Sequence, residues 1–137
     1  FQPAKFLALG RGDSVAVEAT TLSPGIALLP WSPVHPNISF NAEAALNISW
    51  TRRSRAGLLW LDGVDVPLAE ETERYSITLH DRHDRLISET KVHRPTYSLS
   101  KSTIDQLQSA GVDKLNFSIR QVGRFGVSKP LLCFHLF

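Results

Sequence analysis

The sequence has no methionine, only one cysteine, no long apolar run and little net charge. One cysteine excludes a disulfide within the chain. No apolar run approaches the roughly 20 residues that cross a bilayer, so we expect no membrane insertion. The N-terminus lacks the basic and then apolar pattern of a signal peptide. Because methionine is missing even at position 1, we expect a fragment of a longer protein.

The net charge of +2 is too small to argue for a nucleic-acid partner. Hydrophobic residues make up 42% of the 137 residues, which suits one packed domain with or without an arm. The only basic cluster contains Arg52, Arg53 and Arg55. An exposed strand end explains this cluster better than a track for phosphates.

A period of two dominates the chain and predicts half-buried antiparallel strands at 45–52, 74–80, 96–100 and 114–121. On one parity these segments place aromatic, aliphatic or β-branched residues, and on the other small polar ones. The predicted core therefore consists of Leu46, Ile48, Trp50, Tyr75, Ile77, Leu79, Tyr97, Leu99, Leu115, Phe117 and Ile119.

Weaker patterns predict further strands at 14–20, 37–40, 86–92 and 131–137. The segment 37–40 follows two prolines, as an edge strand would. The last segment is apolar throughout and is interpreted as a strand covered on both faces, with Cys133 as a buried, inert thiol. Ser102 and Asp105 resemble a capping box and Gly111 a stop signal, which predicts a short helix at 102–109.

We divide the chain into an N-terminal strand and Pro-rich arm at 1–33 and a β-sandwich at 34–137. Residues 21–36 hold four prolines and show no period, so we expect no regular element there. The same segment is too apolar for a free linker. We therefore expect the arm to pack along the sandwich with a buried Trp31 as its anchor.

The sandwich resembles the fibronectin type III fold, an all-β, immunoglobulin-like antiparallel sandwich. The resemblance rests on the second-strand tryptophan of Leu46-x-Ile48-x-Trp50, on Tyr75-x-Ile77-x-Leu79, and on the sixth strand and loop FSIRQVGRFGVSKP (117–130). The sixth-strand tyrosine of that family falls at Leu115 here. Its corner hydrogen bond must therefore be absent, and the match is to the architecture.

Three strings in order are more specific, namely LLPWSPVHP (28–36), WTRRSR (50–55) and DGVDVPLAEETERYSI (62–77). They resemble the C-terminal part of the tail hub, or host-specificity, protein of gene transfer agents and related prophages. The resemblance implies a location at a virion-like tail tip after synthesis in the bacterial cytoplasm. It implies other tail or baseplate subunits, and a bacterial cell-surface glycan, as partners. It also implies that oligomers belong to the full-length protein.

No arrangement of nucleophile, base and orienting group appears, so we expect no enzyme, no catalytic residue, no metal and no cofactor. The segment HDRHDR (80–85) and the acidic Glu70, Glu71 and Glu73 are interpreted as solvated loops. The candidate contact residues are the loop aromatics Trp31 and Trp60, with Arg52, Arg53 and Arg55.

The predicted function is a non-catalytic structural or binding domain of a baseplate hub. The alternative is a carbohydrate-binding module that serves an upstream glycoside-hydrolase-like domain. A third interpretation, an adhesin or receptor ectodomain, rests on the tripeptide Arg11-Gly12-Asp13 and the sandwich alone.

Overall fold

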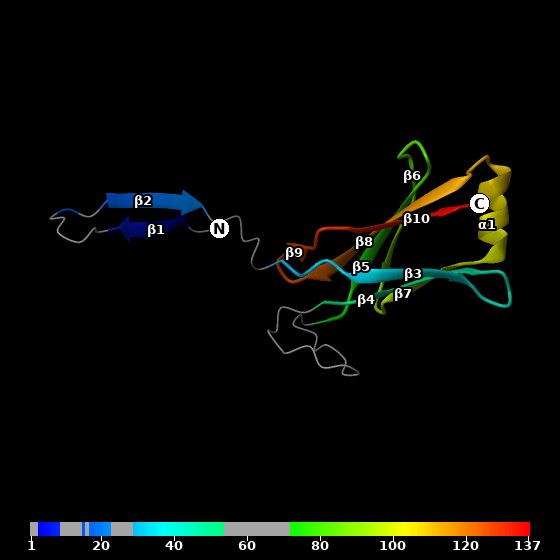
Figure 1. The fold of residues 1–137 in the computed structure, drawn as a ribbon, viewed down its shortest axis with the longest axis horizontal. Coiled ribbons are helices and arrows are strands. Elements are labelled where there is room, and N and C mark those ends of the chain that lie inside the picture. The colour runs from blue at the N-terminus through cyan, green and yellow to red at the C-terminus, as the bar shows by residue number, and fades with distance from the viewer. Residues whose placement is uncertain (1–2, 9–14, 16, 23–28, 54–71) are drawn as a thin grey trace.

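The computed structural model describes residues 3–8, 15, 17–22, 29–53 and 72–137. It consists of a β-sandwich with one helix and of an N-terminal hairpin, seen at opposite ends of Figure 1. No helix in the described ranges is long and apolar enough to cross a membrane.

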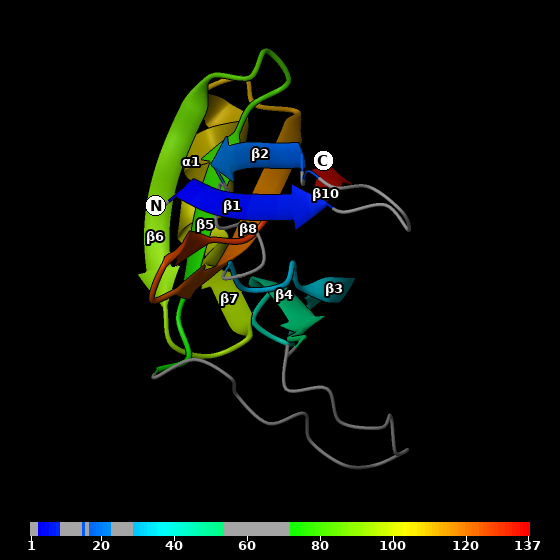
Figure 2. The same ribbon diagram turned by 90° about the vertical axis from the view of Figure 1, so that its left-hand side faces the viewer.

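The larger sheet has the order β10-β8-β5-β6, and all its neighbours are antiparallel. Its strands are β5 (Tyr75–His80), β6 (Leu86–Val92), β8 (Lys114–Gly123) and β10 (Leu131–Leu136), and β9 (Gly126–Val127) extends β8 as a short hairpin. The smaller sheet has the order β3-β4-β7. It contains β3 (Val34–Phe40), β4 (Leu46–Thr51) and β7 (Thr96–Leu99), which lie together in Figure 2.

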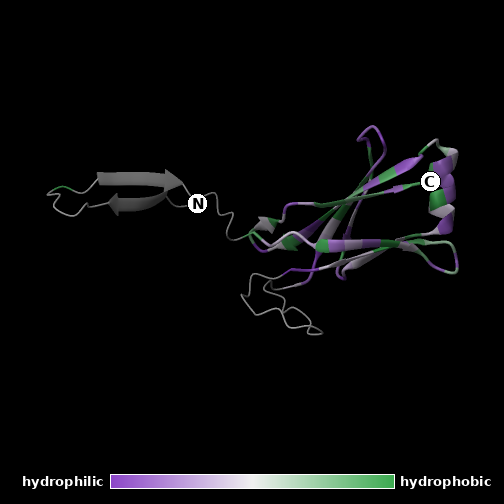
Figure 3. Ribbon diagram, in the orientation of Figure 1, coloured by the Kyte–Doolittle hydropathy of each residue, from purple (hydrophilic) through white to green (hydrophobic). Residues whose placement is uncertain are grey.

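The core between the sheets follows the sequence pattern, because residues of one parity on each central strand face inward. Hydrophobic and hydrophilic residues accordingly alternate along the sandwich strands in Figure 3. Ten of the eleven predicted core residues are buried, and Tyr97 is half-buried against them. Trp50 is 5% exposed and meets Tyr75 edge to face, with 5.1 Å between ring centroids.

The helix α1 (Lys101–Ser109) joins β7 to β8 and buries Ile104 against the end of the core. Its N-cap is Ser100, whose hydroxyl accepts from the Thr103 N–H, so the predicted cap at Ser102 is wrong by two residues. Its C-terminal end confirms Gly111 as the stop. Gly111 has a φ of 86°, and the Val112 N–H donates to the Leu107 carbonyl, as in a Schellman motif.

The N-terminal region departs from the prediction in three ways. β1 (Pro3–Ala8) pairs with β2 (Val17–Leu22) in an antiparallel hairpin, so regular structure reaches into 21–36 from one side. β3 begins at Val34 and enters the segment from the other side. The residue expected as a buried anchor, Trp31, is 47% exposed, whereas Pro30 and Pro33 beside it are buried. The two buried proline rings therefore anchor this segment in place of the indole. Because a proline ring is rigid, its burial costs little conformational entropy.

The last strand is also half-exposed, which contradicts the expectation of cover on both faces. Leu132, Phe134 and Leu136 are 70%, 59% and 56% exposed, while the alternate residues Leu131, Cys133 and His135 are half-buried toward the core. β10 is therefore an ordinary strand with one inner and one outer face. Its sequence does not alternate because the outer face is apolar as well. That outer face is part of the surface described next.

Candidate binding surface

The outer face of the larger sheet combines exposed apolar side chains with a hollow. Strand alternation turns Leu132 and Phe134 of β10 outward, and the register sets Ser118 beside Leu132 and Asn116 beside Phe134. On the far side of β8, His80 of β5 pairs with Asn116. An apolar stripe on one strand therefore borders a polar stripe on the next two.

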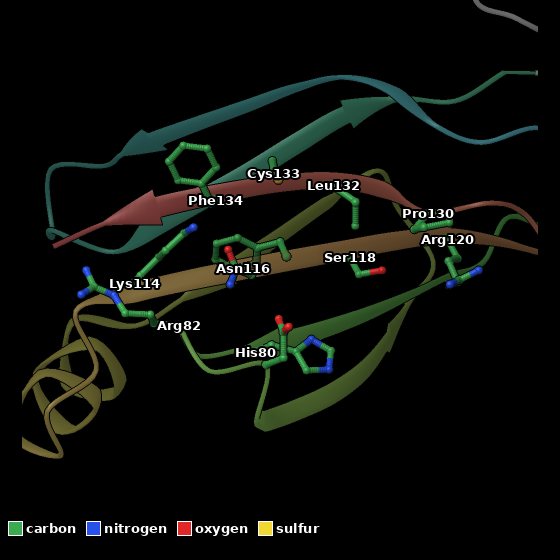
Figure 4. Close-up of a pocket in the computed structure, with 12 residues that line it drawn as sticks. His80, Arg82, Lys114, Asn116, Ser118, Arg120, Pro130, Leu132, Cys133 and Phe134 are labelled. Atoms are coloured by element: carbon green, nitrogen blue, oxygen red, sulfur yellow. The ribbon is translucent and has the colours of Figure 1, made fainter.

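These side chains surround a shallow hollow of about 610 Å³. Figure 4 shows Leu132 and Phe134 on β10, a row from Lys114 to Arg120 on β8, and His80 on β5. The lining residues are His80, Arg82, Asp84, Lys114, Asn116, Phe117, Ser118, Arg120, Pro130, Leu132, Cys133 and Phe134. Because the hollow lies across the middle of the sheet, three strands fix the positions of its walls.

The charges around the hollow are mainly positive. The Arg82 guanidinium pairs with Asp113 at 2.8 Å, and Arg120 donates to the Ser128 carbonyl at 3.0 Å. The Lys114 ammonium lies over the Phe134 ring, 4.7 Å from its centroid, and has no carboxylate partner within the described part of the chain. An exposed ring with an uncompensated cation above it suits a partner that is apolar in part and carries negative charge.

Asn116 and Ser118 provide the polar groups at the floor. The Asn116 amide nitrogen donates to the Asp81 carbonyl at 3.0 Å, which fixes the side chain at the hollow and leaves its oxygen as a hydrogen-bond acceptor. Ser118 and His80 lie on neighbouring strands, yet no hydrogen bond joins them in the described ranges. The floor can therefore bind by hydrogen bonding, but it holds no assembled nucleophile and base.

Cys133 faces inward from β10, next to this surface but turned to the core. Burial raises the pKa of its thiol, so the reactive thiolate is disfavoured at neutral pH. His135 shares its face, as the strand parity predicts, and packs between the rings of Phe40 and Phe137 at 5.3 Å each. Cys133 is half-buried, so the predicted full burial is wrong, and its inertness stays a prediction.

Two of the sequence-derived contact residues lie together at the start of the sandwich. The Arg53 guanidinium lies over the Trp31 ring, 5.2 Å from its centroid, and its Nε donates to the Ser32 carbonyl at 3.0 Å. These contacts hold residues 31–32 against the end of β4. The exposed indole still leaves a partner contact by Trp31 and Arg53 as a prediction.

Arg52 takes part in a separate set of contacts around Glu73. Its guanidinium pairs with Glu73 at 3.2 Å, and the Tyr75 hydroxyl donates to the other Glu73 oxygen at 2.7 Å. Burial, together with the Glu73 carboxylate, raises the pKa of Tyr75 far above its ordinary value of 10. Both charged partners are about one-fifth exposed, so Arg52 is a structural clamp as well as a predicted contact residue.

Several sequence-derived residues lie outside the described residues. They are Arg55, Trp60, Glu70, Glu71 and the tripeptide Arg11-Gly12-Asp13. Trp60 and Arg55 remain predictions as partner contacts.

The segment HDRHDR forms the turn between β5 and β6, organised by Asp81. One oxygen of Asp81 accepts the backbone N–H groups of His83 and Arg85, and the other accepts Arg85 Nε at 2.7 Å. Desolvation acts to raise the pKa of Asp81, but these hydrogen bonds outweigh it and lower the pKa. No group of three potential metal ligands occurs among the described residues.

Sequence reasoning missed the outer face of the larger sheet. Its apolar half lies on β10, whose uninterrupted apolar sequence does not show which residues face outward. Its polar half comes from alternate positions of β5 and β8, which lie more than 30 residues apart in the chain. The available signal was parity, since Leu132 and Phe134 share a face that Cys133 and His135 do not. Periodicity could indicate that a face existed, but only the strand order shows which strands share it.

No family model matches the chain, and no curated protein matches it. Among solved structures, it is similar to domains d3–d4 of the rat CD45 extracellular region, with a TM-score of 0.52 and 7% sequence identity. That alignment covers 99% of this chain and 64% of the other, so this chain spans less than two thirds of its neighbour. A myokine structure aligns over 76% of this chain and 95% of that chain at 14% identity, with a TM-score of 0.44. With the strand order above, the likeness to CD45 shows the fold, and the sandwich is fibronectin type III-like.

Proposed function

We propose that the chain is a non-catalytic binding domain at the tip of a phage-like or gene-transfer-agent tail, where it contacts other tail subunits or a recipient envelope. The observation that carries a binding role is the outer face of β10, β8 and β5, which combines exposed apolar side chains with a cation-lined hollow. The tail location rests on the three sequence strings that resemble tail hub proteins.

The chemistry of this face favours association over turnover. Leu132 and Phe134 are apolar side chains that gain free energy when a partner removes them from water, at roughly 25 cal/mol per Å². Lys114 adds an attraction for carboxylate or phosphate groups at the rim. A fibronectin type III-like sandwich supplies a rigid platform for such a face, and rigid platforms suit binding.

The test uses the labelled chain, purified tail subunits and envelopes of recipient bacteria. We expect saturable binding to one of these, reduced at least about tenfold by Lys114→Ala or Leu132→Ser. The matched controls are Lys91→Ala and Leu86→Ser, which change exposed residues of the same types on β6, outside the hollow. Equal losses in test and control variants, or no binding to either the tail subunits or the envelopes, would contradict the proposal.

A second candidate, a carbohydrate-binding module, is favoured by the exposed Phe134 ring beside the fixed Asn116 amide. An aromatic face with a neighbouring amide suits a sugar ring. Calorimetry with soluble peptidoglycan and lipopolysaccharide fragments separates the two functions. Binding heats that the Asn116→Ala substitution abolishes would favour the carbohydrate-binding module. If the glycan fragments give no binding heat, contact with other proteins remains the favoured function.

A further inference from the structure

We propose that β10 pairs edge to edge with the β10 strand of a second copy of this chain, so that two larger sheets join into one continuous sheet. Among the strands that the structure describes, the sandwich has four edge strands, namely β3, β6, β7 and β10. An open edge strand presents unpaired backbone groups, and proteins normally guard it with charge, proline, a bulge or short length. The four edges differ in this respect.

Three edges carry such protection. β3 contains Pro36, and its register shifts between Val34 and Asn37. β6 carries Glu89 and Lys91 on its outer face, and its register shifts near His80 of β5. β7 is only four residues long.

The remaining edge, β10, has none of these devices. Its six residues, LLCFHL, include no proline and no Lys, Arg, Asp or Glu. Its register with β8 runs without interruption from Leu131 to Leu136. On its other side it contacts β3, where Phe40 meets His135, but no described strand pairs with it.

The backbone groups at this edge can be assigned by alternation. The Phe137 N–H donates to the Asp113 carbonyl across from β10, so the N–H groups of odd-numbered residues in this register point toward β8. Those of Leu132, Phe134 and Leu136 therefore point to the open edge. These three residues also turn their side chains to the exposed outer face.

A second copy is the occupant that fits these features. An antiparallel pair centred on Phe134 sets Phe134 opposite its own copy and Leu132 opposite Leu136. Six apolar side chains then gather on one face, and no charged residue of β10 meets a like charge. The pairing joins the outer faces of two copies, so that two binding hollows face the same way and avidity can strengthen attachment.

The test is sedimentation of the full chain under reducing conditions, which exclude a disulfide through Cys133. The contact is small, so we expect a monomer–dimer equilibrium with a dissociation constant on the order of 10⁻⁵ to 10⁻⁴ M. Amide exchange at Phe134 should slow as concentration rises. A monomer at about 1 mM, or a dimer without that protection, overturns the proposal.

Charge variants test the pairing itself. Phe134→Lys and Phe134→Glu should each be folded and monomeric, because each places like charges opposite one another across the two-fold axis. Mixed together, they should form a heterodimer. Thr96→Lys, on the exposed outer face of β7, should dimerise as the parent does. Dimers of either Phe134 variant alone would refute the pairing. His80→Ala changes the lining of the hollow on β5, which β8 separates from β10, and should leave dimerisation unchanged, so the two proposals fail separately.

Discussion

At the scale of single residues, Trp50 is a large aromatic side chain in the core of the sandwich. It is almost fully buried and packs against Tyr75 between the sheets. We expect Trp50→Ala to lower the free energy of unfolding by about 3–5 kcal/mol, since it deletes a large buried ring and leaves a cavity. Urea denaturation measures the loss. Trp50→Phe, which keeps part of the ring volume, should lose clearly less, and equal midpoints for all three proteins would contradict the core described here.

Asp81 makes the stability depend on pH. Its pKa is lowered in the folded chain by hydrogen bonds from His83 and Arg85, which outweigh the opposing effect of desolvation. The resulting stability is present above the ordinary carboxyl value of 3.8 and is lost as the pH falls through the lower folded-state pKa. We expect the free energy of unfolding to decrease with pH in that window.

Two substitutions in the same turn separate this effect from general acid unfolding. Asp81→Asn cannot titrate, so its stability should change less with pH below about 4 than that of the parent. The control Asp84→Asn alters an exposed residue with a φ of 58°, a conformation that asparagine tolerates well. Its pH profile should match the parent, and identical profiles for all three proteins would remove Asp81 as the source.

At the scale of elements, the end of α1 depends on one glycine. Gly111 has a φ of 86°, and a Cβ there would meet no atom within 4 Å, so any cost of substitution comes from the backbone. We expect Gly111→Ala to lower the free energy of unfolding by about 1 kcal/mol. Gly111→Asn should cost less, because asparagine enters this region more readily. Thermal denaturation of the three proteins compares them, and an unchanged alanine variant would argue against the Schellman end.

The same scale shows what the sequence could predict. The strands β4, β5, β7 and β8 alternate cleanly, because each has one dry and one wet face, and their core residues follow from parity alone. β1 was missed because its sequence, PAKFLA, does not alternate. The helix cap was misplaced because hydroxyl residues lie both at the N-cap (Ser100) and in the first turn of α1 (Ser102 and Thr103), and only geometry selects Ser100 among them. The binding surface could not be predicted, since it requires the order of three strands that are distant in the chain.

At the scale of the whole molecule, the start of the sandwich lies earlier than residue 34. Pro30 and Pro33 are buried, and Leu29 is half-buried. A Cβ at Gly126 of β9 would come within 2.7 Å of Leu29 Cδ2, so the two segments are in close contact. Residues 29–33 therefore belong structurally to the sandwich, whereas β1 and β2 pair with each other and with no other described strand.

Two truncations test this boundary. A chain that starts at Leu29 should unfold with a free energy within about 0.5 kcal/mol of the parent, since it loses only the hairpin and its connection. A chain that starts at Val34 also loses two buried proline rings and the carbonyl that accepts from Arg53. It should lose about 2–4 kcal/mol, as expected for side chains returned from the core to water. Urea denaturation measures both. Equal stability of the two truncated chains would place the boundary at 33/34, and a large loss in the longer one would make the hairpin part of the sandwich.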